Sequence, residues 1–485
     1  MILALVAAAV LVQDSATARL ASTSDSVAVL DFATFHAQVR ERHPVARQAE
    51  LLEARATAEV MAARGPVWDP VLGAEWNRKA FQSKEYYNYL EAGLSLPTPI
   101  GVEFKLGYQK TRGANINPDR TTPDDGLWVA GVTFPVGQGL LTDARRNALA
   151  EARGLRDAAV ADRQAQVNEL LFAAARDYAA WYEARRRRTV AREGVELALG
   201  SYRFVRSRFE NGDAAAIDTI EAGLELQRRL VAQLEADNAW FVTSQVVSTY
   251  LWDERAVPYD LAPGVVPTLA GLAPMAADTT AIDGWLARAL ERHPDLLKVL
   301  ARQRVAEANR RYYGQELLPD VTFDVAAIKD GATGPFSDWP GADDNYKFGL
   351  AGKTSLLLMK ERGRYNAAGA RVESAALEAA MVRRELRTTV LASANEATTY
   401  QCIVETQRGA VAQARELRHG ETRRFQEGES TLFLVNQRDR LLLEEAGKLA
   451  GFEAKYLAAR AALAVALGGT LSEDGSVLPL APPTR

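Results

Sequence analysis

Two segments of the chain carry apolar residues at helical spacing over an unusual length. They run from about residue 140 to 210 and from about residue 360 to 426, and neither contains a proline. At 1.5 Å of rise per residue, about 70 residues of helix make a rod of roughly 105 Å. Each rod is followed by a glycine, Gly212 or Gly428, and then by a shorter helix-patterned segment. Because glycine readily ends a helix in the left-handed conformation, the pattern predicts two long helices, each with a return helix.

Other segments alternate apolar and polar residues, which is the period of β-strands. In both halves two such segments precede the long helix: Val71–Lys79 and Trp128–Val136, then Val321–Ile328 and Tyr346–Leu356. Alternating segments of about ten residues flanked by aromatics are more typical of an outer-membrane barrel than of a soluble core.

The first half carries extra residues between its two strands. The offset between the halves is 250 at Val71 and Val321, and it falls to 218 at Gly131 and Gly349, a difference of about 32 residues. The extra stretch, near residues 80–127, holds two more alternating segments, Tyr87–Leu96 and Val102–Gln109, around a Pro-Thr-Pro-Ile-Gly turn. It predicts an added β-hairpin in the first half.

Two short signatures recur in the same order, which indicates an internal duplication. Glu-Arg-His-Pro at 41–44 returns at 291–294, and Arg-Phe-x-x-Gly at 208–212 returns at 424–428. Each half is predicted as helix, two strands, long helix, turn and return helix. The predicted division is a first repeat at 30–256, a linker at 257–281, a second repeat at 282–469 and a C-terminal tail at 470–485.

The first residues form an apolar, uncharged run, and we interpret residues 1–21 as a secretory signal peptide without its basic leader. The run is too short to span a bilayer as a helix, which needs about 20 residues, and no other segment approaches that length. A chain of this kind crosses a membrane only as strands closed into a barrel. Lipid offers no hydrogen bonds, so every backbone N–H and C=O group inside the bilayer must be paired within the protein.

The composition and the motifs of the chain argue against several classes of function. The 58 basic and 62 acidic side chains give a net charge of −4, without the basic footprint that nucleic acid requires. Cys402 is the single cysteine, so the sequence predicts no intrachain disulfide and no cysteine metal cluster. His43 and His293 belong to the repeated element and are interpreted as structural. The sequence holds no motif of a nucleotide site, a hydrolase elbow or a metalloprotease, so we expect neither an enzyme nor a cofactor.

Taken together, these motifs resemble the TolC-like family of bacterial outer-membrane efflux proteins. The resemblance is carried by the duplicated helix starts at Pro44 and Pro294, the two Arg-Phe-x-x-Gly turns, the passage Gly131–Pro135 and the Leu-Gly-Gly close at 467–469. It implies a homotrimer in which four strands from each chain close a 12-stranded outer-membrane β-barrel, continued by a long α-helical barrel in the periplasm. Four strands alone leave open edges, which is why copies are needed.

The resemblance also implies functional positions. The turn residues would lie at the periplasmic tip and contact an adaptor protein: Arg208, Phe209, Gly212, Arg424, Phe425 and Gly428. Asp218, six residues after Gly212, would form a carboxylate ring that favours cations in the trimer, unless it is a solvated helical aspartate. Leu434 and Gln437 follow Gly428 by six and nine residues and suggest an apolar constriction or core packing instead. Pro135 would bend the first strand-to-helix passage, and Ser355 replaces the proline expected in the second.

The function implied is an exit duct of a tripartite efflux system. It would be a passive channel gated at its periplasmic tip, expelling small molecules together with a periplasmic adaptor and an inner-membrane pump. A type I protein secretion system is an alternative with the same fold, and the sequence does not separate the two cargoes. A non-membrane coiled-coil scaffold is an alternative of another class, but it leaves the paired strand segments unexplained.

Overall fold

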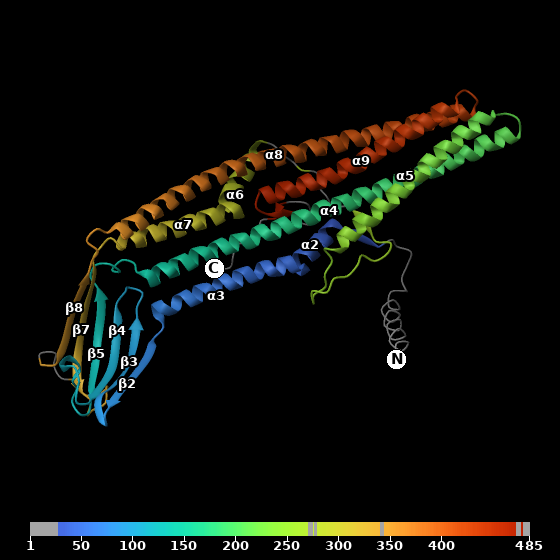
Figure 1. Ribbon diagram of the computed structural model, residues 1–485. Helices are drawn as coiled ribbons and strands as arrows, with labels where there is room; N and C mark the ends of the chain where they lie inside the picture. Colours follow the sequence, from blue (N-terminus) through green and yellow to red (C-terminus); the bar gives the residue numbers. More distant parts are fainter. Residues whose placement is uncertain (1–27, 270–274, 276–278, 340–343, 472–476, 479–485) are drawn as a thin grey trace, which may run out of the picture. The chain divides into compact units, whose positions relative to one another are not determined.

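The computed structural model describes residues 28–269, 275, 279–339, 344–471 and 477–478 (Figure 1). The predicted signal peptide and most of the predicted tail lie outside the described residues. The chain forms two compact units. Of the described residues, one unit comprises those within 28–39, 174–269 and 403–457 and is called the tip unit, because it holds both predicted tip turns; the other comprises those within 40–173, 275–402 and 458–478 and is called the sheet unit.

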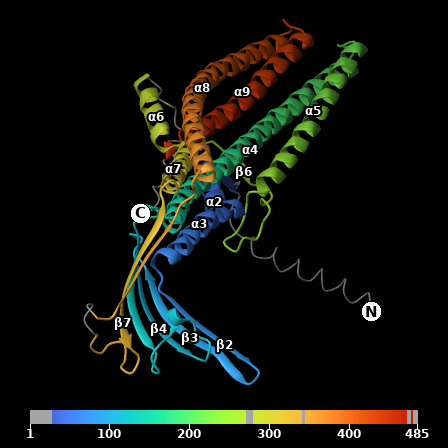
Figure 2. The same ribbon diagram turned by 60° about the vertical axis from the view of Figure 1, so that its left-hand side comes forward.

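The sheet unit contains one antiparallel sheet in the order β2-β3-β4-β5-β7-β8 (Figures 1 and 2). Its strands are β2 (Val71–Phe81), β3 (Lys84–Pro97), β4 (Glu103–Arg112), β5 (Leu127–Pro135), β7 (Asp320–Asp330) and β8 (Tyr346–Lys353). All six alternating segments are therefore strands. The predicted added hairpin is β3–β4, and it lies inside the sheet between β2 and β5. The chain thus has six strands in this sheet where the family resemblance implies four.

Helices precede each group of strands, as the repeat predicts. They are α3 (Pro44–Trp68) in the first repeat, and α6 (Thr279–Arg292) and α7 (Pro294–Gln315) in the second. His43 and His293 are the N-caps of α3 and α7, and in each the imidazole Nδ1 accepts the backbone N–H two residues later. Proline follows as the first helical residue, where its missing N–H is not needed. Both repeated histidines are thus structural, as predicted.

The long helices are α4 (Ala144–Glu210) and α8 (Met359–Gln426), of 67 and 68 residues, or roughly 100 Å at 1.5 Å per residue. In the sheet unit, the first part of α8 packs against α6 and the end of α9 (Leu432–Ala466) through small side chains. Ala394 and Ala397 of α8 are buried against Leu463 near the end of α9 and Ala289 of α6. Alanine at these positions allows the close helix approach that its small size predicts.

The tip unit contains the second half of α4, α5 (Ala216–Ser248), the end of α8 and most of α9. Its core is aromatic, with Tyr178 and Trp181 of α4 fully buried beside Phe35 of α2 (Phe32–Arg42). The Tyr178 hydroxyl lies 2.7 Å from the Leu30 carbonyl in β1 (Val29–Asp31), which pairs in parallel with β6 (Val266–Thr268). β6 falls within the segment predicted as a linker.

The remaining elements are short: a 3-10 helix at Pro118–Arg120, and β9 (Thr470–Leu471) paired with β10 (Val477–Leu478). Among the residues described, no helix combines the length and the apolar character needed to cross a membrane.

Candidate functional site

One face of the sheet is apolar and uncovered. Strand register places Leu72, Leu94, Leu106, Ala130 and Ala327 in one row across five strands. Side chains two residues away on each strand share that face, and nearly all are apolar. Large apolar side chains on it are strongly exposed, at 80 % for Leu72, 66 % for Trp76 and 64 % for Leu350. An exposed apolar face of this extent marks contact with a partner or with lipid.

The opposite face is polar and hollow. It carries charged and polar side chains on every strand: Glu75, Glu91, Lys105, Thr133, Asp324 and Lys347. A hollow of about 700 Å³ is lined mainly by this face. Gly73, Gly93 and Gly107 lie side by side in one row, and the missing side chains let the sheet curve toward the polar side. The hollow on the polar face indicates that this face is the concave one and that the apolar face is the convex one. Figure 2 shows the bend of the strands.

Aromatic residues lie toward both ends of the apolar face. Near the helices, the rings of Phe134 and Phe323 lie 4.7 Å apart, and toward the other end those of Tyr108 and Trp128 lie 4.9 Å apart. Phe134 and Trp128 are six residues apart on β5, or about 20 Å at 3.3–3.4 Å per residue. Outer-membrane barrels carry an apolar band about 25 Å tall with aromatic girdles at its borders, and this face has those proportions.

The two strand-to-helix passages differ, as the loss of the second proline suggests. Pro135 ends β5, and Arg146 of α4 then donates hydrogen bonds to the carbonyls of Gly139, Leu140 and Leu141. In the second passage Ser355 is exposed, and only five residues, 354–358, separate β8 from α8. The bend there uses Leu358, whose φ of +50° is strained for a residue other than glycine.

The two Arg-Phe-x-x-Gly turns have the same geometry. Gly212 and Gly428 both have φ of +82°, and both N–H groups donate to the carbonyl of the phenylalanine three residues earlier. The next N–H donates over 2.8 Å to the carbonyl of Arg208 or Arg424 in each turn. The same arginine donates to the carbonyl five residues after it, at 3.1 Å in the first turn and 3.5 Å in the second. Glycine is favoured here because other residues adopt this conformation only at a cost in free energy.

The phenylalanines of the turns occupy different surroundings. Phe425 packs edge-to-face against Phe204 of α4 at 5.5 Å, so that a turn residue of the second repeat contacts the first repeat. Phe209 is 44 % exposed. An exposed aromatic beside a helix turn is a surface suited to a protein partner.

The residues predicted as gate lie in the first two turns of the return helices. Asp218 is half-buried, and its Oδ2 accepts the backbone N–H of Ala215 at 3.2 Å, which caps α5. Leu434 is half-buried and Gln437 is exposed on α9. Within the described part of the chain, no hydrogen bond or ion pair joins Asp218 to Leu434 or Gln437. The structure therefore gives Asp218 a local capping contact, and its role in a ring remains a prediction.

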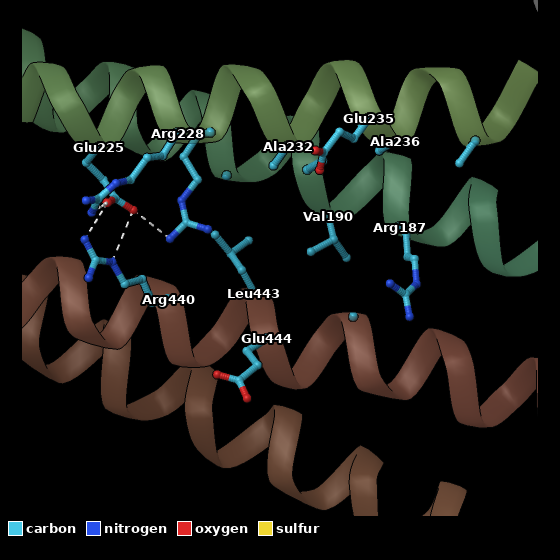
Figure 3. Close-up of a pocket in the computed structure, with 15 residues that line it drawn as sticks. Arg187, Val190, Glu225, Arg228, Ala232, Glu235, Ala236, Arg440, Leu443 and Glu444 are labelled. Carbon is cyan, nitrogen blue, oxygen red and sulfur yellow. Dashed lines mark hydrogen bonds and ion pairs between the residues drawn. The ribbon is translucent and has the colours of Figure 1, made fainter.

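An ion-pair cluster between α5 and α9 was not predicted from the sequence (Figure 3). Glu225 is buried, and its carboxylate meets Arg229 at 2.8 Å and Arg440 at 2.5 Å, with Arg228 at 3.8 Å. Burial acts to raise the pKa of Glu225, but the arginine contacts together hold the pKa below its ordinary value. The cluster borders a groove of about 670 Å³ between α4, α5 and α9. Glu225 and Arg229 are four residues apart on one helix, which sequence spacing can reveal; Arg440 lies 215 residues away.

A second set of ion pairs repeats the duplication. Arg192 of α4 lies 3.8 Å from Asp237 of α5, and Arg408 of α8 lies 3.1 Å from Glu453 of α9. Both members are offset by 216 residues (408 − 192 and 453 − 237), the offset of the Arg-Phe-x-x-Gly turns. Each pair joins a long helix to its own return helix. The offset between the turns is the sequence signal that finds these pairs.

Comparison with known proteins shows what the chain is similar to. Residues 285–469, most of the second repeat, match the family model described as outer membrane efflux protein. No curated protein matches the sequence. The fold is similar to the outer membrane protein VceC from Vibrio cholerae, with 16 % identity, a TM-score of 0.61, and coverage of 90 % of this chain and 95 % of that one.

Two outer membrane channels have a similar fold. CmeC from Campylobacter jejuni is 11 % identical, with a TM-score of 0.61 over 90 % of this chain and 84 % of that one. MtrE from Neisseria gonorrhoeae is 14 % identical, with a TM-score of 0.62 over 94 % and 95 % of the two chains. The resemblance to TolC-like outer-membrane efflux proteins is therefore confirmed, by fold over most of the chain and by the family model over the second repeat.

Proposed function

We propose that the protein is an outer-membrane exit duct of an efflux system, a passive channel through which small molecules leave the cell. The observation that carries the proposal is the curved sheet, whose convex face is apolar and uncovered and whose concave face is polar. Lipid fits the convex face, and water with solute fits the concave one. The family match of the second repeat supports an efflux role in the outer membrane.

The proposed assembly is a homotrimer. β2 and β8 are the edges of the sheet in this chain, and their unpaired N–H and C=O groups cannot remain open in lipid. Pairing of edges between copies closes the sheet into a barrel. The helices would continue the conduit into the periplasm, where the two turns at Gly212 and Gly428 would meet a periplasmic adaptor, and through it an inner-membrane pump that supplies energy.

The proposed gate is the set of return-helix starts near those turns. Three copies of Asp218 would give a carboxylate ring that favours cations. The Glu225 cluster would hold α5 against α9 in the closed state, because separating the helices would take the buried Glu225 carboxylate away from Arg440, its partner on α9. Engagement of the adaptor at the turns would widen the tip.

The test is the state of the protein extracted from outer membranes. We expect it to require detergent, to have three times the mass of one chain after correction for bound detergent, and to conduct ions in planar bilayers. A stable single-copy particle that is soluble without detergent would contradict the proposal and support the coiled-coil scaffold instead.

A further inference from the structure

We infer that the closed barrel of this protein has eighteen strands, formed by three chains in which β2 of one copy pairs with β8 of the next. The inference rests on the proposed trimer and concerns the surface that completes it. Each chain contributes six strands, so three chains contribute eighteen. The family resemblance alone implies twelve.

The added hairpin is an integral part of the sheet. β3 pairs with β2 along Lys84–Ser95 and with β4 along Asn88–Pro97. β4 pairs in turn with β5 along Glu103–Gln109. The hairpin therefore occupies the middle of the sheet, and in this chain β2 is linked to β5, β7 and β8 through it.

The hairpin also carries the two-faced pattern of its neighbours. Leu94 and Leu106 lie in the apolar row of the convex face, whereas Glu91 and Lys105 lie on the concave face. If the hairpin projected into water as a loop, a continuous apolar side would be exposed to solvent, which is unfavourable. The pattern matches strands that lipid contacts on one side and water on the other.

The open edges fit each other in direction. Strands alternate in direction across the sheet, and six is an even number, so β2 and β8 run in opposite directions. An edge-to-edge contact between copies related by a rotation about the barrel axis is therefore antiparallel, like every other pair in this sheet. A single inserted strand would reverse one edge, whereas a hairpin preserves the direction of both.

The edges also fit in chemistry. On the convex face Trp76 of β2 and Phe348 of β8 are both exposed, so the seam would continue the apolar band. On the concave face β2 presents Glu75 and, nearer its outer end, Lys79, whereas β8 presents Lys347 and Lys353; Glu75 is the side chain of opposite charge that the β8 lysines can meet. Opposite charges on neighbouring strands stabilise a sheet, whereas like charges destabilise it. The partner that fits these edges is a second copy of this chain.

The consequence is a wider pore through the membrane. Barrel diameter grows roughly in proportion to strand number at constant tilt, so eighteen strands give a barrel about 1.5 times as wide as twelve. The rods of the helical part need not widen with it, because the hairpin adds no helix.

Electron cryomicroscopy of the detergent-extracted trimer in lipid nanodiscs tests the inference directly. We expect eighteen strands in the membrane ring, with β2 of each copy hydrogen-bonded to β8 of the next. A trimer with a twelve-stranded ring, in which β3 and β4 lie outside the ring, would overturn this inference and leave the proposed function intact. A membrane-free monomer would overturn both.

A deletion variant supplies a second measurement. Glu75 and Leu127 lie in one row of the sheet, through Glu91 and Gln109, so replacing residues 76–125 by one asparagine leaves an Asn-Gly turn between them. In planar bilayers we expect the largest neutral polymer that enters from the strand end to fall to about two-thirds of its radius. A variant that shortens only the loop 115–120 should keep the original limit. An unchanged limit in the inserted deletion variant would contradict the widening.

Discussion

Replacing Glu225 with glutamine removes the charge at the centre of the α5–α9 cluster and keeps the side-chain volume. The carboxylate is 8 % exposed and accepts from both Arg229 and Arg440. Glutamine offers one acceptor oxygen and no charge, so one of the two charged hydrogen bonds is lost and the other is weakened.

The structure sets the size of the effect. A hydrogen bond to a charged group contributes about 1.5–3 kcal/mol, but the Arg440 side chain is 49 % exposed and water replaces part of what it loses. We therefore expect the variant to lose about 1–2 kcal/mol of the contact between α5 and α9. That loss corresponds to a factor of roughly 5–30 in the equilibrium between joined and separated helices.

Protonation of Glu225 at low pH should have the same effect as the substitution by glutamine. The arginine contacts hold the pKa of Glu225 below the ordinary value of 4.5 in the folded protein. A depressed pKa means that the stabilisation is complete above the ordinary value and is lost as pH falls through the depressed one. The wild-type protein should therefore approach the behaviour of the glutamine variant as pH falls below 4.5.

Single-channel recording in planar bilayers measures the outcome as the fraction of time that the channel is open. Glu235 lines the same groove, is exposed and, within the described residues, takes part in no ion pair, so Glu235→Gln is the matched control. We expect Glu225→Gln to increase the open fraction and Glu235→Gln to leave it unchanged. Equal open fractions for the two variants at neutral pH would refute the assignment of the cluster to the closed state.

Three further outcomes follow from other contacts. Burial lowers the pKa of His293, whose neutral Nδ1 caps α7. The melting temperature should therefore fall as pH drops below 6.5 and through the lowered pKa. His293→Asn keeps a capping acceptor without a titrating group, so its melting temperature should depend less on pH. Gly212→Ala and Gly428→Ala should each cost about 1 kcal/mol in chemical unfolding because of their positive φ, whereas Gly200→Ala in the interior of α4 should stabilise by about 0.5–1 kcal/mol. Asp218→Asn keeps an acceptor that caps α5 but removes the charge. It should lower the cation selectivity in reversal-potential measurements while the melting temperature stays the same. Unchanged selectivity would show that Asp218 is not part of the gate.

Much of the fold can be predicted from the chain because its signals are local and duplicated. Alternation alone identifies all six strands, and the difference in offset places the extra hairpin at β3–β4. The turns at Gly212 and Gly428 are predictable because glycine at a helix end has a specific backbone role.

The rest depends on contacts between distant residues. Arg440 reaches Glu225 across 215 residues, and no spacing rule pairs them. The place of the hairpin within the sheet is set by strand register, which the alternation of single strands does not determine. The positive φ of Leu358 also cannot be predicted from the sequence, because the surrounding structure holds this leucine in a conformation that leucine disfavours.

The parallel pairing of β1 with β6 has a consequence for the order of folding. Val29 and Val266 are partners 237 positions apart, and the Tyr178 hydroxyl that binds both strands comes from the helix between them. Closing a loop of that length costs conformational entropy, and the contacts of the ladder offset this cost only after the two strands have met. Because β6 follows the first repeat in sequence, β1 cannot pair with it until the whole first repeat has been synthesised, and we therefore expect this short ladder to form only after that point.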